Sequence, residues 1–373
     1  MLQTVEPPEE LLTPTELAKR DDLKTRKPRV YEKVRRFNER ADEGVISPIL
    51  RLAYNFLCNM HCEHCCAEHY MDRHLIQLTG KREQRRELTH EDIGELARQA
   101  DEYGIFRFVL TGGEPLTYKD LYTVIKVIDP DRHLVICDSN AWLLDDERAR
   151  QLADNGVYKM QVSLDSFDEQ EHDRFRNKPG SYKRVMRSIP AVLKTGMKLI
   201  LSTCLVHDRV LTQEFEDLCK FCTDNGCGLY VTYAKPVGNC KQHMEWVLTK
   251  QDADRLRLLE KKYNVFTHMT PSFGRHTGCI TVKGINTVTS TGEIVPCPYM
   301  DWSIGNFLHE PLATILNRGM LIKDLGPQRN DCVIGEDMAF IRRHNAKVEG
   351  RVHLPVPFGE GWTEDDLIQR QTV

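Results

Sequence analysis

The sequence lacks long hydrophobic runs, and it lacks an excess of charge of either sign. No apolar run in its 373 residues approaches the roughly 18–20 residues that a membrane span requires. The first ten residues include glutamates where a secretory signal would carry basic and then apolar residues. Lysine and arginine together number 51 against 55 aspartates and glutamates, a formal net charge of −4. We therefore expect a cytoplasmic protein with no membrane span and, because nucleic-acid footprints are more strongly one-signed, no nucleic-acid partner.

Cysteine, by contrast, is abundant. Thirteen cysteines are present, and an uneven number without a secretory signal argues against a disulfide framework. Metal ligation, redox chemistry and packing in the core remain as explanations. Hydrophobic residues make up 40% of the chain and charged residues 28%, which is typical of a globular protein with a packed core. The spacing of the cysteines must therefore indicate which of them carry chemistry.

The first part of the chain, residues 1–48, is expected to be a charged helical extension. Basic and acidic side chains are mixed along it, while Val30, Val34 and Phe37 recur at helical spacing. This pattern predicts a helix with one thin apolar stripe that packs on the main body. A solvated outer face explains its charges better than contact with a nucleic acid or an anionic lipid surface.

Residues 49–240 alternate short β-like runs with amphipathic helical stretches. The strands are expected at 49–55, 106–111, 133–138, 158–165, 198–206 and 229–234. Because each of the five crossovers is long enough for a helix, the strands should pair in parallel with right-handed connections. This predicts an α/β fold, an open partial (β/α)6 barrel, with ligand sites at the carboxyl ends of its strands. Residues 241–373 lose the alternation and should form a small α+β domain with a β-hairpin at 281–296.

Three cysteines, Cys58, Cys62 and Cys65, form a C-x3-C-x2-C pattern just after the first expected strand. Three thiolates on a cubane iron–sulfur cluster leave one iron free for a substrate or cofactor. A structural zinc site would instead need four ligands, for which Cys66 or a neighbouring histidine is available. A cluster, a zinc ion and inert buried cysteines all stay open at this point.

Two adjacent glycines, Gly112 and Gly113, follow the second expected strand and precede Glu114 and Pro115. Without a Cβ, they let the backbone approach a ligand closely and leave its N–H and C=O groups accessible. A glycine pair alone is weak evidence for a site. Together with the cysteine pattern, however, it places two motifs on one rim of one barrel.

The two motifs together resemble those of the radical S-adenosylmethionine (radical SAM) superfamily, and the resemblance extends over residues 49–335. It implies that Cys58, Cys62 and Cys65 hold a [4Fe–4S] cluster whose free iron chelates S-adenosylmethionine (SAM). It also implies a strip that contacts the methionine amino group of SAM. The strip consists of Gly112, Gly113, Glu114 and Pro115.

Weaker matches extend the resemblance around the barrel. His64 precedes the third cysteine, where the family usually has an aromatic ring that touches adenine, so its imidazole is expected to stack there. By the same resemblance, Asn140 and Ser163 would contact the ribose or carboxylate of SAM, and Arg176 would pair with the carboxylate. A helix cap or a surface salt bridge is the alternative for each of these three residues.

A second set of cysteines, Cys279, Cys297 and Cys332, resembles part of the ligand set in the SPASM/twitch extension of radical SAM enzymes. The resemblance implies one auxiliary [4Fe–4S] cluster, because the cysteines are too few for two. Three ligands are present where four are expected, so the fourth position would be open to substrate or filled by another residue. The candidates are Cys240, His276, Glu336 and Asp337.

The resemblance implies an enzyme that cleaves SAM reductively to a 5′-deoxyadenosyl radical, which abstracts hydrogen from a substrate. A reductase such as flavodoxin or ferredoxin would supply the electron, and the auxiliary cluster would assist a net oxidation (dehydrogenation) or an epimerisation. The short, charged extension is unlike the leader-binding domain of peptide-modifying relatives, which favours a small molecule such as a sugar or aminocyclitol. Crosslinking or epimerisation of a ribosomally made peptide is the alternative. A zinc-stabilised binding module without enzymatic activity is a remote one.

Overall fold

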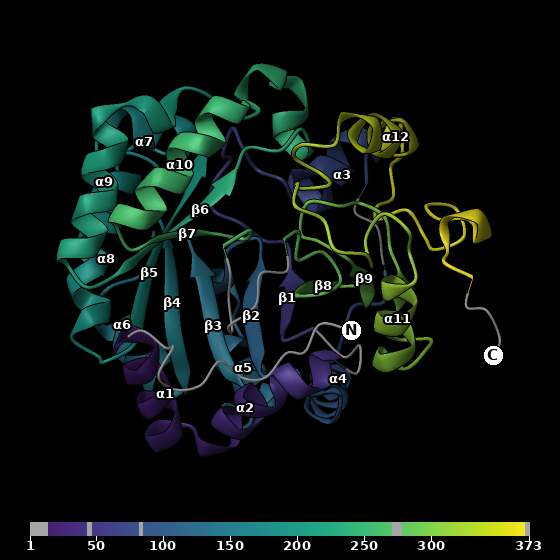
Figure 1. Ribbon diagram of the computed structural model, residues 1–373, viewed down its shortest axis with the longest axis horizontal. Coiled ribbons are helices and arrows are strands. Elements are labelled where there is room, and N and C mark those ends of the chain that lie inside the picture. The colour runs from purple at the N-terminus through teal and green to yellow at the C-terminus, as the bar shows by residue number, and fades with distance from the viewer. Residues whose placement is uncertain (1–13, 43–46, 82–84, 271–277, 370–373) are drawn as a thin grey trace.

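The computed structural model describes residues 14–42, 47–81, 85–270 and 278–369. They contain a ten-stranded sheet with the strand order β10-β9-β8-β1-β2-β3-β4-β5-β6-β7 (Figure 1). From β1 to β7 each strand pairs in parallel with the next one along the chain. The predicted α/β partial barrel of six parallel strands is therefore confirmed, and β7 adds a seventh parallel strand at its edge.

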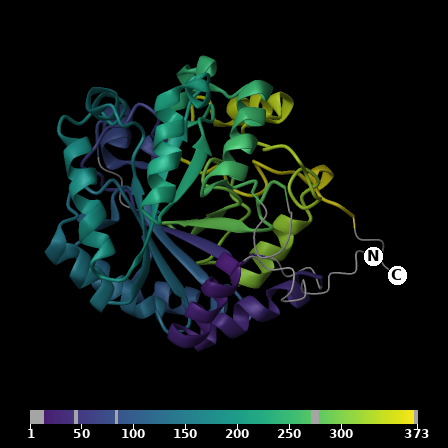
Figure 2. The same cartoon turned by 60° about the vertical axis from the view of Figure 1, so that its left-hand side comes forward.

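The six predicted strands of the barrel begin and end within two residues of the predicted positions, and β7 was not predicted. They are β1 (Ile49–Asn55), β2 (Arg107–Gly112), β3 (Leu134–Ser139), β4 (Val157–Ser163), β5 (Lys198–Leu205), β6 (Gly228–Tyr233) and β7 (Val265–Thr267). Helices connect them and form the outer layer (Figure 2). These helices are α3 (Asp72–Thr79), α4 (His90–Tyr103), α5 (Leu121–Ile128), α6 (Asp146–Asp154), α7 (Glu169–Phe175), α8 (Ser181–Leu193), α9 (Gln213–Asp224) and α10 (Lys250–Lys262).

Helix α4 illustrates how the local sequence sets these elements. Thr89 caps its first turn in a reciprocal capping box with Asp92, and Gly104 ends it with a positive φ of 97°. Ile93 and Leu96 recur on one face and are fully buried in the main core. None of the helices in the described ranges is both long and apolar enough to cross a membrane.

The alternation of β1 separates an apolar outer core from a polar interior. Leu50 and Leu52 are fully buried in the main core, while Arg51 between them belongs to the other face. There its guanidinium lies 3.0 Å from the Asp138 carboxylate and donates to the Thr111 hydroxyl at 2.8 Å. An ion pair in this position means that the space enclosed by the strands is not a purely hydrophobic core.

Helices α1 (Pro14–Arg26) and α2 (Pro28–Asp42) lie below the strands in Figure 1. Val30 and Phe37 of α2 are buried against side chains at the amino ends of three strands. These side chains are Phe106, Leu134 and Tyr158. The predicted apolar stripe is therefore confirmed, and it covers the end of the barrel opposite to the carboxyl ends of the strands.

The C-terminal part contains the predicted hairpin, formed by β8 (Ile285–Thr289) and β9 (Glu293–Val295). Strand β8 also pairs in parallel with β1, so the hairpin continues the barrel sheet. The first strand of an open barrel leaves one edge of N–H and C=O groups unpaired, and β8 satisfies that edge. The remaining elements are β10 (Gly305–Asn306), α11 (Leu312–Met320) and α12 (Met338–Val348).

Candidate active site

The loop after β1 carries Cys58, Cys62 and Cys65, all half-buried and none in a disulfide. Backbone contacts from two distant segments hold this loop in place. Glu63 donates its N–H to the Phe175 carbonyl at 3.1 Å. Asn239 donates its N–H to the Cys65 carbonyl and its Nδ2 to the Cys62 carbonyl, both at 2.9 Å. The shape of the loop therefore depends on the end of α7 and on the segment after β6 as well as on its own residues.

The glycine pair lies directly against the start of this loop. Gly113 donates its N–H to the Asn55 carbonyl at 2.9 Å, and Glu114 donates to the Leu57 carbonyl at 2.7 Å. A Cβ on Gly113 would lie 1.9 Å from the Leu57 oxygen, and one on Gly112, whose φ is 116°, would lie 2.2 Å from the Asn55 oxygen. No other residue fits at either position. The structure thus brings the two predicted motifs together at the carboxyl ends of β1 and β2.

The Glu114 side chain is buried and accepts three hydrogen bonds from the chain. Its donors are the Ser139 hydroxyl at 2.7 Å, the Asn140 N–H at 2.7 Å and the Leu116 N–H at 3.1 Å. Burial raises the pKa of Glu114 to about 7, although these hydrogen bonds act in the opposite direction. The carboxylate therefore joins β2 to β3, and the backbone of the strip is what faces the cysteine loop.

Asn140 connects the end of β3 to the cysteine loop. Its Nδ2 donates to Asn59 Oδ1 at 2.8 Å, and its Oδ1 accepts from the Trp142 N–H at 3.0 Å. The Nδ2 of Asn59 is buried and has no hydrogen-bond partner in the described chain. Ser163 lies at the end of β4, beside Ser202 of β5. An unsatisfied donor inside the cysteine loop is a position that a bound polar group would satisfy.

Arg176 lies between a carboxylate and a cluster-motif thiol. Its Nε donates to Asp165 Oδ2 at 2.6 Å, and its Nη1 lies 3.9 Å from Cys62 Sγ. Burial alone would raise the pKa of Asp165, but the Arg176 guanidinium holds it well below its usual value. The predicted partner of Arg176 was the carboxylate of SAM. In the structure part of the guanidinium is already committed to Asp165.

His64 stacks on a ring that the sequence analysis did not identify. Its imidazole lies 4.2 Å from the Phe175 ring centre, with 16° between the planes. Burial, followed by the nearby Arg176 charge, lowers the pKa of His64 to about 3, so the ring is neutral at physiological pH. Its Nδ1 is buried without a hydrogen-bond partner in the described residues. Since Phe175 covers one face of the imidazole, only the other face is left for a flat base.

The second set of cysteines comes from three separate segments, and all three side chains are buried. Cys279 donates its N–H to the Arg329 carbonyl at 2.9 Å, which joins two of the segments. The thiols of Cys279 and Cys332 share a hydrogen bond, which lowers the pKa of Cys279. Cys279 also lies close enough to Cys297 to influence the pKa of its thiol. The structure therefore brings together the three cysteines that the sequence placed in one site.

The four candidates for a fourth ligand separate in the structure. Asp337 caps α12 and pairs with Arg329 at 2.8 Å, so its carboxylate is committed elsewhere. Cys240 is buried in the turn after β6, near Cys66 and Lys235. His276 lies outside the described residues. Glu336 accepts the Cys332 N–H at 2.6 Å and is thus in direct contact with a cysteine of the set.

Neither set of cysteines brings three ligand atoms together as compactly as a single zinc ion requires in the described chain. Zinc–sulfur bonds of about 2.3 Å in a tetrahedral site place the sulfurs about 4 Å apart. In the described chain, only His207, Asp208 and Asp252 bring three ligand atoms within 4.8 Å of one another. Neither set of cysteines reaches that spacing. A centre with several metal ions accommodates thiolates that are farther apart.

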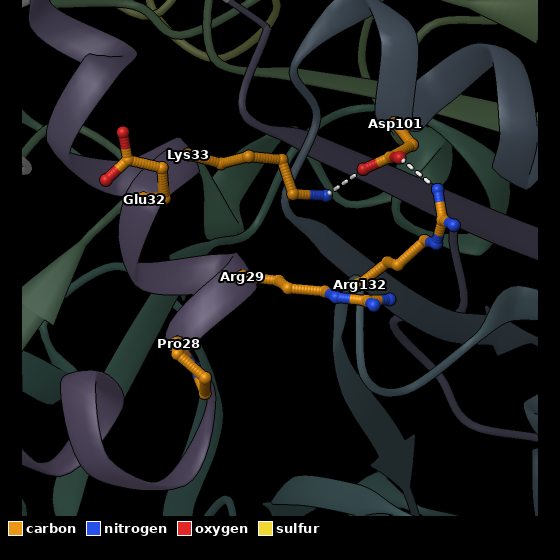
Figure 3. Close-up of a pocket in the computed structure, with 6 residues that line it drawn as sticks. All are labelled: Pro28, Arg29, Glu32, Lys33, Asp101 and Arg132. Atoms are coloured by element: carbon orange, nitrogen blue, oxygen red, sulfur yellow. Dashed lines mark hydrogen bonds and ion pairs between the residues drawn. The ribbon is translucent and has the colours of Figure 1, made fainter.

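Two hollows of about 510 Å³ open on the surface. One lies below the barrel, where Lys33 and Arg132 both point to Asp101 at 2.8 and 2.9 Å (Figure 3). Lys33 and Arg132 are already paired there, and the hollow lies at the amino ends of the strands. The other hollow lies beside the cysteine loop, with Phe56 on one side and Ser290 of the hairpin on the other. The second hollow is the one next to the candidate active site.

A parallel partial barrel with a three-cysteine loop after its first strand is the architecture that the sequence led us to expect of a radical SAM protein. Residues 55–222 match the family model described as the radical SAM superfamily. The chain contains a radical SAM domain. Members of this superfamily are enzymes, and they bind a [4Fe–4S] cluster and SAM. The match argues against the remote alternative of a non-enzymatic zinc module.

Curated relatives and solved structures agree with this assignment. An AdoMet-dependent heme synthase of Oleidesulfovibrio alaskensis is 24% identical over 279 residues, which cover 67% of this chain and 69% of that protein. A GTP 3′,8-cyclase of Clostridium perfringens is 27% identical over 198 residues, covering 52% and 57%. The structure of Streptococcus suis SuiB bound to precursor peptide SuiA has a TM-score of 0.55 at 16% identity, covering 85% of this chain and 72% of that chain. Native anSMEcpe with bound AdoMet and a Cp18Cys peptide has a TM-score of 0.53 at 15% identity, covering 73% and 81%. These two structures support the fold alone.

Proposed function

We propose that the chain is a radical SAM enzyme with an auxiliary [4Fe–4S] cluster that assists the oxidation (dehydrogenation) or epimerisation of a small molecule. The observation that carries this proposal is the position of Cys66. Cys66 lies close enough to both Cys65 and Cys297 to raise the pKa of each thiol, which supports a common interior for the two cysteine sets. Substrate held in that interior would lie between a radical source and an electron acceptor. We keep the division into 1–48, 49–240 and 241–373 as part of the proposal.

The residues of the first set fit the cofactors of the family. Three free thiols, with the unsatisfied Asn59 Nδ2 and His64 Nδ1 beside them, form a donor set for a cluster and a polar ligand. When bound, the reduced cluster and SAM would supply a 5′-deoxyadenosyl radical for hydrogen abstraction. Cys58, Cys62 and Cys65 would hold the cluster. Arg176, 3.9 Å from Cys62 Sγ, would stabilise the negative charge of that thiolate.

The remaining residues of the SAM site would bind and orient. Gly112 and Gly113 keep the backbone of the strip next to the cysteine loop, and Glu114 fixes its attachment to β3. Asn140 and Ser163 would provide polar contacts at the ends of β3 and β4. His64 would present the face of its imidazole that Phe175 leaves open to the adenine. Each of these roles depends on the positions that the carboxyl ends of the strands give to these residues.

The second set fits an auxiliary cluster better than ordinary packing. Its thiols are buried, come from three segments and do not all three converge within 4.8 Å in the described chain. Cys279, Cys297 and Cys332 would bind three irons, with Glu336 as the nearest candidate for the fourth position. An acceptor in this place would take the electron that a dehydrogenation releases. A reductase such as flavodoxin or ferredoxin would supply electrons for the first cluster.

Two observations favour a small molecule. The curated relatives described above are named for heme and GTP, both small molecules. The hollow beside the cysteine loop, about 510 Å³, lies within the range of small-ligand pockets, roughly 300–1,000 Å³. If the substrate is instead a peptide, the proposal changes to crosslinking or epimerisation of a ribosomally made peptide. The genes next to this one would discriminate, since a precursor-peptide gene would favour the peptide.

The central test is anaerobic reconstitution of the full chain with iron and sulfide. About eight irons per chain are expected for two [4Fe–4S] clusters, and the Cys279→Ala, Cys297→Ala double variant should keep about half. The reduced wild-type protein should convert SAM to 5′-deoxyadenosine, which liquid chromatography measures. Zinc in place of iron, or no 5′-deoxyadenosine from the reduced protein, would overturn the proposal.

A further inference from the structure

Lys235 is a buried cation that pairs with no carboxylate within 4.0 Å in the described chain. It follows β6 and is only 3% exposed. Its Nζ donates to the Tyr233 carbonyl at 3.3 Å and lies 4.1 Å from the centre of the Tyr299 ring. Neither contact carries a negative charge. A charged side chain that is removed from water in this way needs an anion nearby.

Cysteines surround Lys235: Cys66, Cys204 and Cys240 of the barrel, and Cys297 and Cys332 of the second set. A Cβ on Gly335 would lie 3.1 Å from Cys332 Sγ and 3.7 Å from Lys235 Cε, so the two side chains flank the same glycine. Burial raises the pKa of the Cys297 thiol to about 12, and the charge of Lys235 acts against that rise. The hydrogen bond with Cys279 and burial raise the pKa of Cys332, again opposed by Lys235.

A second buried lysine, Lys283, lies near Cys279 of this set. Lys283 is 5% exposed and donates to the backbone carbonyls of Leu325 and Pro327, the latter at 3.1 Å. Its nearest charged neighbours are Cys279 and Arg329. No carboxylate in the described residues pairs with it. Two buried ammonium groups therefore lie near the three buried thiols, and thiolates on a metal cluster would supply the missing negative charge.

We propose that Lys235, with Lys283 in support, is the counter-charge of the auxiliary cluster and raises its reduction potential. The inference rests on the proposed auxiliary cluster. Net charge near an iron–sulfur cluster is one of the factors that set its potential, because a nearby cation stabilises the reduced, more negative state. Lys235 acts through the cluster and is a positioning residue in this role. A raised potential suits a cluster that accepts an electron from a substrate radical.

The test measures the reduction potential of the auxiliary cluster directly. In a parent with Cys58→Ala, Cys62→Ala and Cys65→Ala, only the auxiliary cluster should assemble, and an EPR-monitored redox titration gives its midpoint. Lys235→Met and Lys235→Gln should lower the reduced fraction at a fixed potential about tenfold, equivalent to about 59 mV for a one-electron couple. Lys235→Arg, which keeps the charge, should stay within about twofold of the parent. Lys283→Met should shift the midpoint in the same direction.

The controls separate this inference from the proposed function. Lys250→Met removes a lysine whose side chain is 90% exposed, and it should leave the midpoint unchanged. No iron in the triple-alanine parent would overturn the auxiliary cluster and this inference together. A normal iron content with an unchanged midpoint in Lys235→Met and Lys235→Gln would overturn this inference alone. If one neutral variant loses the cluster, the midpoint of the other is compared with that of Lys235→Arg, which keeps the positive charge.

Discussion

Cys58, Cys62 and Cys65 lie half-buried on one short loop, whereas Cys279, Cys297 and Cys332 come from three segments and are each more than nine-tenths buried. The first set depends on backbone contacts that shape its loop. The second depends on tertiary contacts that bring distant segments together, such as the hydrogen bond from Cys279 to the Arg329 carbonyl. A local site of this kind is open to a cofactor that binds and leaves. A buried one suits a permanent centre.

The largest expected effect comes from removing one ligand of the loop. Cys58→Ala should reduce 5′-deoxyadenosine formation to the background of the assay, because an incompletely bound cluster has no stable site for SAM. Its iron content should fall by about half, with the auxiliary cluster retained. Liquid chromatography and iron analysis measure the two quantities. The matched control is Cys204→Ala, a cysteine of β5 outside both sets, which should keep its full iron content. Wild-type 5′-deoxyadenosine formation by Cys58→Ala would contradict the assignment of the loop.

The two regions also differ in how far the sequence predicts them. The loop and the glycine pair are local patterns, so their spacing placed them correctly next to each other. The strands followed from hydrophobic periodicity. Phe175, which stacks on His64, and Lys235 were missed, because nothing in the sequence distinguishes a buried lysine from an exposed one. Only its burial next to Gly335 of the C-terminal part makes Lys235 unusual.

The three donors to Glu114 show the same limit at the first site. Two of them, from Ser139 and Asn140, lie at the end of β3. The sequence does not show that these groups would reach the Glu114 carboxylate. The pairing of β8 with β1 was likewise not predicted, because the hairpin was expected to belong to a separate domain. Local motifs are thus predictable, while their neighbours across the sheet depend on topology.

Ion pairs in the two regions should differ in their contribution to stability. Asp165→Asn leaves the buried Arg176 without its charge partner, and we expect a loss of about 3–5 kcal/mol in the free energy of unfolding. The matched change in the second region is Asp337→Asn, which removes a partly exposed pair with Arg329 and keeps a residue that can cap α12. It should cost less than about 1 kcal/mol. Urea unfolding measures both values, and equal losses would contradict the comparison.

The pKa of Glu114 predicts a pH dependence that belongs to the first site. Burial raises this pKa from its ordinary value of 4.5 to about 7, so the folded protein holds its proton more tightly than the unfolded chain does. The associated stability is complete below about pH 4.5 and is lost as the pH rises through about 7, by up to about 3 kcal/mol. Glu114→Gln should remove this component. Thermal unfolding without SAM between these pH values measures the difference, and parallel curves for the two proteins would contradict it.

The smallest effects compare one glycine from each region. An added methyl group at Gly113 would meet the Leu57 carbonyl at 1.9 Å, and one at Gly278, where φ is 59°, would meet the Arg329 carbonyl at 1.6 Å. Each alanine variant should lose about 1–3 kcal/mol through local displacement of the backbone. Gly94→Ala is the control, since nothing lies within 4 Å of its Cβ position in α4, and it should gain up to about 1 kcal/mol.

Iron analysis then distinguishes which site each glycine supports. Because Gly113 supports the loop at Leu57, Gly113→Ala should weaken the first cluster and spare the auxiliary one. Gly278 precedes Cys279 in the chain, so Gly278→Ala should do the reverse. The EPR signals of the two clusters, recorded separately in the Cys58→Ala and Cys297→Ala backgrounds, assign the loss. If both glycine variants affected the same cluster, the two regions would be one cooperative unit, and the contrast between a local and a tertiary site would fail.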